Sequence, residues 1–156
     1  MKETIYDVFW EGPFEWDNIE EHIEPTHVLY GLQGFHHLYG HDVLLYIGRT
    51  GAGLNNRLSN HDTWVEDEYD LMKVRIASIG EFIGWKQRNE IETYPKADPD
   101  IVHRIEAMLI YAHQPAYNTM NKESVKRARG IRIFNTGKSG PLLPEISFWY
   151  HDSQEK

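Results

Sequence analysis

The sequence contains no cysteine, which excludes disulfide bonds, cysteine nucleophiles and thiolate metal sites. It also lacks any apolar run close to the roughly 20 residues that a membrane-spanning helix requires. Its first ten residues, MKETIYDVFW, have neither the basic start nor the apolar stretch of a secretory signal. These absences favour a cytoplasmic protein with no membrane partner.

Positive charge is scarce as well. The 156 residues include 16 Lys and Arg against 24 Asp and Glu, so the formal net charge is -8. Hydrophobic residues make up 40% of the chain and charged residues 26%, a balance typical of a single folded domain of this length. A net charge of -8 argues, taken alone, against nucleic acid as the partner.

The acidity is concentrated at the N-terminus. Residues 1–27 hold eight acidic residues against Lys2 alone, a charge of -7, so the rest of the chain carries only -1. Residues 122–138 hold six basic residues against Glu123, a local charge of +5. Because salt screens charges beyond about 10 Å, a polyanion responds to such patches rather than to the total. The net charge therefore does not exclude a nucleic-acid substrate.

The chain divides into three segments. Residues 1–25 are predicted to form an acidic, aromatic-rich N-terminal arm that packs against the domain, either for solubility or as a shield against polyanions. Residues 26–120 carry the main domain. Residues 121–156 are predicted to form a basic segment and a C-terminal β-hairpin packed on the same domain.

Hydrophobic patterns predict strands near residues 27–32, 43–48, 72–79, 131–134 and 146–150. A helix is predicted after Gly53, and a second helix over residues 99–113, because Asp98-Pro99-Asp100 is a helix start and Pro115 a stop. The predicted fold class is α+β, with a small, mostly antiparallel, three-stranded sheet flanked by helices and a C-terminal β-hairpin.

Six side chains on these elements suit phosphodiester cleavage. A carboxylate holds a divalent ion with several waters, a guanidinium grips phosphate, and a phenol or imidazole accepts a proton from the attacking water. The six residues are Tyr30, Tyr46, Arg57, His61, Glu106 and Asn118.

Each of these residues has a structural interpretation when it is taken alone. The two tyrosines suit cross-strand packing in the core, and His61 suits a hydrogen-bonded core position. Arg57 and Glu106 suit the surface and the shoulder of amphipathic helices, and Asn118 suits a turn.

The order and spacing of the six residues resemble the GIY-YIG nuclease domain. The second half of that signature is literal in Tyr46-Ile47-Gly48, whereas the first tripeptide, Val28-Leu29-Tyr30, keeps only its tyrosine. Tyr39 is a rival for the first tyrosine, but it lies only seven positions before Tyr46, which leaves little room for two strands and a turn. The resemblance covers residues 26–120.

The resemblance implies a metal-dependent endonuclease that cleaves DNA with one Mg²⁺ or Mn²⁺ ion. It implies that Glu106 binds the metal and that Tyr30 acts as general base or positions the water, with His61 assisting proton movement. Tyr46 would orient the nucleophile and the phosphate, and Arg57 would stabilise the phosphate and the leaving group.

Three further residues complete the implied site. Asn118 would brace the site from its loop, Gly48 would allow close packing below it, and Arg49 would reach a phosphate. A phosphate contact is also predicted for the basic stretch Lys126, Arg127, Arg129 and Arg132, whose alternative role is a charged strand edge that prevents aggregation.

Several alternatives stay open. The chain could instead be a non-catalytic GIY-YIG-like module that binds nucleic acid or protein, or an unrelated α+β domain whose tyrosines belong to the core. The loop with His36, His37 and His41 suits either a transition-metal site or a polar contact surface. Neither the DNA specificity nor the biological role follows from the sequence, and a homodimer is compatible with it.

Overall fold

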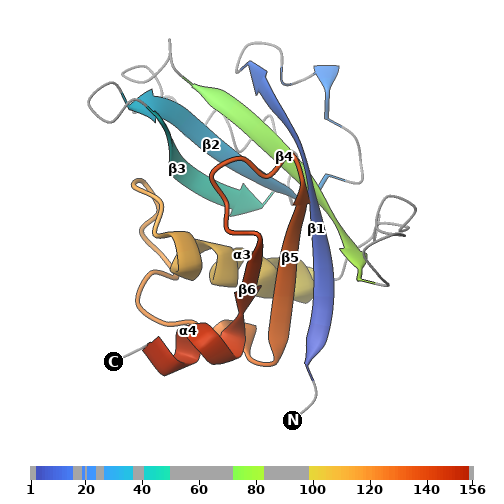
Figure 1. Ribbon diagram of the computed structural model, residues 1–156, viewed down its shortest axis with the longest axis vertical. Helices are drawn as coiled ribbons and strands as arrows, with labels where there is room; N and C mark the ends of the chain where they lie inside the picture. The colour runs from blue at the N-terminus through green and yellow to red at the C-terminus, as the bar shows by residue number, and fades with distance from the viewer. Residues whose placement is uncertain are drawn as a thin grey trace.

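The computed structural model describes residues 3–15, 19, 21–23, 27–36, 41–49, 72–82 and 99–154 (Figure 1). The strands are β1 (Thr4–Glu15), β2 (Leu29–His36), β3 (His41–Arg49), β4 (Lys73–Glu81), β5 (Ile131–Gly137) and β6 (Glu145–Ser147). The helices are α3 (Pro99–His113) and α4 (Phe148–Gln154), with a 3₁₀ turn, η4, at Lys126–Ala128.

The strands form one six-stranded sheet in the order β3-β2-β4-β1-β5-β6. The pairs β2–β3, β2–β4, β1–β4 and β5–β6 are antiparallel, whereas β1 and β5 are parallel, so the sheet is mixed. The sheet curls into a half-barrel around α3 (Figure 1).

The predicted fold class is wrong. A three-stranded antiparallel sheet flanked by helices was expected, but the described residues are mostly β, with six strands and only two short α-helices. The error arises mainly at β1, which lies between β4 and β5. Its acidic residues disfavour a strand on propensity alone, yet Tyr6, Val8 and Trp10 alternate into the core.

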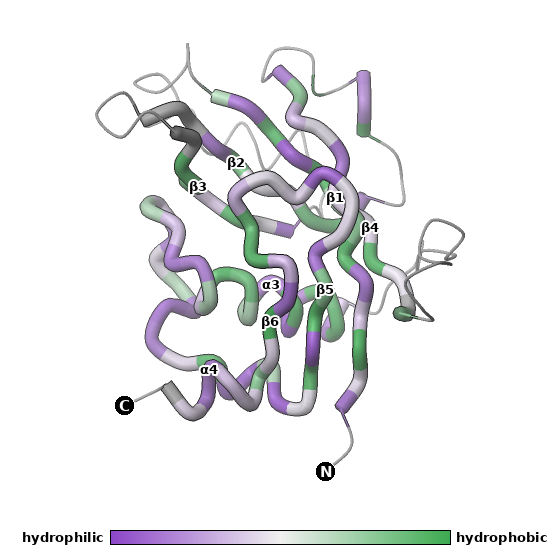
Figure 2. Tube along the Cα trace, in the orientation of Figure 1, coloured by the Kyte–Doolittle hydropathy of each residue, from purple (hydrophilic) through white to green (hydrophobic). Residues whose placement is uncertain are grey.

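The acidic N-terminal segment is therefore a central strand over Thr4–Glu15. Hydrophobic and hydrophilic residues are mixed along β1 and β5 (Figure 2), and burial alternates over the first four residues of β5, Ile131 to Phe134. The carboxylate of Asp7 on β1 is also buried, and it accepts a hydrogen bond from the hydroxyl of Thr136 on β5. Deleting this segment would remove the strand that joins the two halves of the sheet.

The C-terminal end also differs from the prediction. A strand was expected over Ile146–Tyr150, but β6 ends at Ser147 and α4 begins at Phe148. The hydroxyl of Ser147 accepts a hydrogen bond of 3.2 Å from the backbone N–H of Trp149. This contact satisfies one of the N–H groups that a helix start leaves unpaired, so it favours a helix here.

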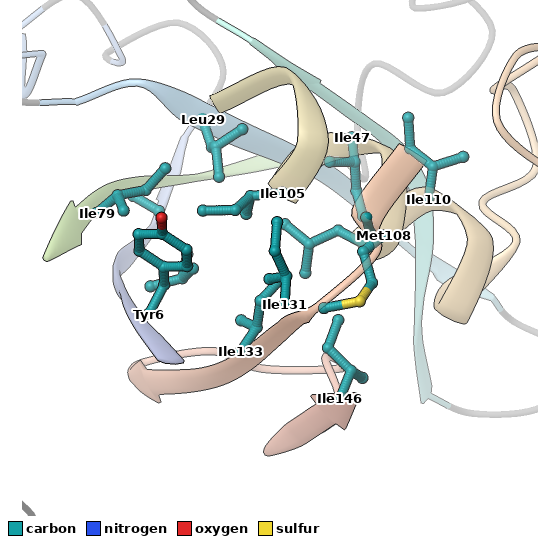
Figure 3. Close-up of a cluster of buried hydrophobic side chains, with 14 of the residues drawn as sticks. Tyr6, Leu29, Ile47, Ile79, Ile105, Met108, Ile110, Ile131, Ile133 and Ile146 are labelled. Atoms are coloured by element: carbon teal, nitrogen blue, oxygen red, sulfur yellow. The ribbon is translucent and has the colours of Figure 1, made fainter. Parts of the chain in front are cut away.

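The main core fills the space between α3 and the sheet (Figure 3). The helix contributes Ile105, Met108 and Leu109, all fully buried. They pack against apolar side chains from all six described strands, including Tyr6, Leu29, Ile47, Ile79, Ile131 and Ile146. Full burial of each such side chain stabilises the fold by roughly 1.5–3 kcal/mol, so α3 is held firmly.

No helix in the part of the chain that the structure describes is long and apolar enough to cross a bilayer.

Candidate functional site

A pocket of about 230 Å³ lies between β3, α3 and the loop that follows α3. Four of the predicted site residues line it: Tyr46, Arg49, Glu106 and Asn118. Its other lining residues are Ile47, His103, Ile110, Thr119, Met120 and Asn121. Side chains that are far apart in the sequence thus meet around one space.

Glu106 lies on α3 at the edge of the buried helix face, and its side chain is 12% exposed. Its Oε1 is 3.3 Å from Nε of Arg49, whose side chain is 32% exposed. Nε of Arg49 is buried and makes no hydrogen bond, so the contact is electrostatic. A largely buried carboxylate requires a positive partner, because an uncompensated charge is costly in a medium of low dielectric constant.

His103 precedes Glu106 by one helical turn and faces the same pocket. Burial lowers the pKa of His103, and the cations Arg49 and Arg127 lower it further, while Asp100 opposes them. Nη1 of Arg127 donates a hydrogen bond to Nε2 of His103. The site therefore favours the neutral imidazole. His103 was not among the predicted site residues, although its spacing of three from Glu106 would have indicated it.

Asn118 ties the loop after α3 to the backbone of β3. Its Oδ1 accepts a hydrogen bond of 2.9 Å from the N–H of Ile47, and its Nδ2 donates one of 2.9 Å to the carbonyl of Ile47. The N–H of Tyr117 donates a further hydrogen bond of 2.8 Å to the carbonyl of Leu45. Because β3 lies at one edge of the described sheet, the loop occupies hydrogen-bonding groups that an edge strand otherwise exposes.

The two predicted tyrosines lie side by side, but only one lines the pocket. The ring centroids of Tyr30 and Tyr46 are 5.9 Å apart. Tyr30 is fully buried, and a Cβ at Gly48 would lie 2.7 Å from its hydroxyl oxygen. Gly48 therefore leaves room for the Tyr30 ring, whereas Tyr46 is the phenol that borders the pocket.

Two of the predicted catalytic residues, Arg57 and His61, lie outside the described residues. The same holds for the side chains of the histidine loop, His36, His37 and His41. The rival tyrosine, Tyr39, also lies outside them.

The basic side chains of the predicted phosphate-binding stretch have different partners. Arg132 binds Glu3 through Nε at 2.9 Å and Glu145 through Nη1 at 3.0 Å, and these partners raise its pKa. Arg127 instead turns toward His103, and Lys126 and Arg129 are exposed. The backbone of this stretch is held to α3, because Arg104 donates hydrogen bonds to the carbonyls of Arg127 and Arg129 at 3.1 and 2.8 Å.

The side chains that line the pocket suit Mg²⁺ better than Zn²⁺. Among the described residues, no three His, Cys, Asp or Glu side chains gather as a metal cage. A structural or catalytic zinc site needs three or four such ligands. Mg²⁺ binds through one or two carboxylates and keeps several waters, and a single carboxylate such as Glu106 in a pocket of about 230 Å³ suits this kind of binding.

No protein-family model, curated protein or solved structure matches this chain. The functional interpretation therefore depends on the residues and their geometry.

Proposed function

We propose that this protein is a metal-dependent endonuclease of the GIY-YIG type that hydrolyses phosphodiester bonds in DNA. The observation that supports it most is the shared pocket of Tyr46, Arg49, Glu106 and Asn118. The antiparallel pairing of β2 with β3, which brings Tyr30 beside Tyr46, also agrees with the tyrosine hairpin of that family.

Glu106 is the proposed ligand of one Mg²⁺ or Mn²⁺ ion. Its carboxylate is largely buried and already has a cation, Arg49, as its neighbour, so the position stabilises positive charge. When bound, the ion would offset the charge of the phosphate and assist the departure of the leaving oxygen.

The side chains around Glu106 have complementary proposed tasks. Arg49 holds the scissile phosphate, since a guanidinium matches phosphate oxygens with a pair of donors. Tyr46 orients the water that attacks, and Asn118 keeps the loop against β3. Tyr30 supports Tyr46 from the core, because its burial keeps it away from solvent. The proposed role of Arg57 is still to stabilise the leaving group, and that of His61 is to assist proton movement.

A second candidate function is a non-catalytic module on the same scaffold that binds nucleic acid or protein. The ion pair between Arg49 and Glu106 favours it, because a carboxylate neutralised by the protein itself needs no metal. The two candidates differ in whether phosphodiester bonds are cut.

The test compares wild-type protein with Glu106→Gln on supercoiled plasmid, branched DNA and single-stranded DNA, each with Mg²⁺ or with EDTA. Wild-type protein is expected to cut at least one substrate only with the ion. Glu106→Gln should cut it on the order of 100-fold more slowly, the scale on which loss of one charge-stabilising group acts. Glu123→Gln is the matched control, since this glutamate is exposed and outside the pocket.

Two results would overturn the proposal that this protein is a nuclease. One is no cutting of any substrate by wild-type protein. The other is equal rates for wild-type protein and Glu106→Gln. Binding of DNA without cutting would favour the non-catalytic module instead.

A further inference from the structure

A second hollow, of about 470 Å³, opens where β1 bends. It shares no lining residue with the pocket around Glu106. Its volume lies within the range of roughly 300–1,000 Å³ that is usual for small-ligand sites. The lining residues are Phe9, Trp10, Glu11, Gly12, Pro13, Phe14, Gly137 and Lys138.

Two partly exposed aromatic rings in this hollow are held in place. The ring of Phe9 lies over Gly137, where a Cβ would come within 2.9 Å of it. The ring of Phe14 stacks on His22, with centroids 4.0 Å apart and planes 15° apart. Gly137 has a φ of 68° and Gly12 a φ of 122°, conformations that favour glycine. A ligand would meet rings that are already fixed, which lowers the entropy lost on binding.

The polar groups of the hollow carry opposite charges. The side chain of Glu11 is 45% exposed and holds Nε2 of His27 at 3.0 Å through one oxygen, Oε1. Lys138 is exposed, and its backbone N–H is fixed by a hydrogen bond of 2.9 Å to the carbonyl of Trp10. None of the ion pairs found among the described residues involves Lys138.

We propose that this hollow binds an unpaired nucleotide of the DNA substrate. A base stacks on the faces of aromatic rings such as Phe9 and Phe14. Its amino edge donates to a carboxylate, as cytosine does to Glu, and Glu11 supplies that acceptor. The attached phosphate is attracted by Lys138. This inference rests on the proposed function and narrows its substrate class to DNA with unpaired bases.

The charges favour a nucleotide over a cationic peptide. A lysine or arginine side chain would also bind between aromatic rings and a carboxylate. However, Lys138 at the same hollow would repel it, whereas a nucleotide satisfies both the acidic and the basic group.

The test measures binding of the full chain to a fluorescein-labelled single-stranded oligonucleotide by anisotropy, with EDTA present so that no cutting occurs. Phe9→Leu and Phe14→Leu are each expected to weaken binding about tenfold, the scale of loss of one stacking partner. Lys138→Gln should weaken it several-fold. The matched controls are Phe82→Leu, whose ring packs on Phe134, and Lys73→Gln, an exposed lysine that does not line the hollow. Both should bind like wild-type protein.

Thermal unfolding verifies that each variant is folded. If a phenylalanine variant does not fold, Lys138→Gln still tests the site, because Lys138 is exposed and its substitution should leave the fold intact. The inference is overturned if wild-type protein does not bind the oligonucleotide, if Lys138→Gln binds as well as wild type, or if the controls lose as much affinity. Tighter binding of a lysine-rich peptide than of the oligonucleotide would overturn it as well. Glu106→Gln should keep full affinity, so loss of cutting and loss of binding report separately on the proposed function and on this site.

Discussion

Nε of Arg49 lies 3.3 Å from Oε1 of Glu106, so a cation from β3 already neutralises the proposed metal-binding carboxylate. The contact lacks a hydrogen bond, and both side chains keep some exposure to solvent. Partly exposed ion pairs contribute on the order of 1 kcal/mol. A divalent ion with a phosphate beside it could replace such a partner, because Arg49 would then pair with the phosphate.

Removing Arg49 should therefore separate metal binding from cutting. Arg49→Gln is expected to bind Mn²⁺ several-fold more tightly, because the competing cation is lost, while its cutting rate falls. Electron paramagnetic resonance of free Mn²⁺ measures the first quantity, and plasmid nicking measures the second. Lys73→Gln, which removes an exposed cation outside the pocket, should change neither. Unchanged or weaker Mn²⁺ binding by Arg49→Gln would show that arginine and metal do not compete.

Gly48 offers a test of the packing beneath the pocket. A Cβ there would lie 2.7 Å from the hydroxyl oxygen of Tyr30, which is fully buried. Gly48→Ala should lower the free energy of unfolding by about 1–3 kcal/mol, the usual cost of overfilling a packed core. Urea denaturation followed by circular dichroism measures this change.

Gly31→Ala is the matched control, because Gly31 lies in the neighbouring strand and a Cβ there would find its nearest side chain at 3.7 Å. That distance is an ordinary van der Waals contact, so the free energy of unfolding of this variant should equal that of wild-type protein or be slightly higher. Equal destabilisation by the two substitutions would show that the close approach of Tyr30 does not restrict Gly48.

Elements whose ends are marked by nearby residues were predicted correctly, whereas pairing between strands far apart in the sequence was not. The helix predicted over residues 99–113 coincides with α3, because Pro99 and Pro115 mark its ends locally. The strands of Tyr30 and Tyr46 were also indicated by local patterns, although β2 and β3 run further than expected, to His36 and from His41.

The pairing of strands that are far apart in the sequence was not indicated by any local pattern. The parallel pairing of β1 with β5 joins the two ends of the chain, with Val8 opposite Asn135. Nothing near either strand specifies that partner, so the six-stranded sheet was not predicted. In the pocket, Glu106 and Asn118 were singled out by local signals, a carboxylate on the shoulder of a predicted helix and an asparagine after a turn, and the resemblance then assigned their roles. His103 was overlooked because a histidine on a helix is common, although its spacing of three from Glu106 places both residues on one side of α3.

His113 connects the end of α3 to the segment before β6, and its protonation should weaken the fold. Its Nδ1 donates a hydrogen bond of 2.7 Å to the carbonyl of Leu109, and its Nε2 accepts one of 2.9 Å from the N–H of Leu143. Only the neutral ring can do both, because a protonated Nε2 no longer accepts. Burial is the main cause that lowers the pKa of His113, with the charge of His151 acting in the same direction.

A lowered histidine pKa means that the native state binds fewer protons than the unfolded state below about pH 6.5. The stability from His113 is thus fully present above the unfolded pKa and is lost as the pH falls through the lower, folded pKa. The free energy of unfolding of wild-type protein should decrease with acidification in that window. His113→Gln should show a shallower decrease, measured by urea denaturation between about pH 5 and pH 8.

His103 and His151 also have lowered pKa values, so the slope alone does not identify His113. Hydrogen exchange at the amide of Leu143 does, because this N–H bonds directly to His113. Its protection should fall with acidification in wild-type protein and in His151→Gln, and should be low at every pH in His113→Gln. Protection of Leu143 that does not vary with pH in wild-type protein would exclude His113 as the group that titrates.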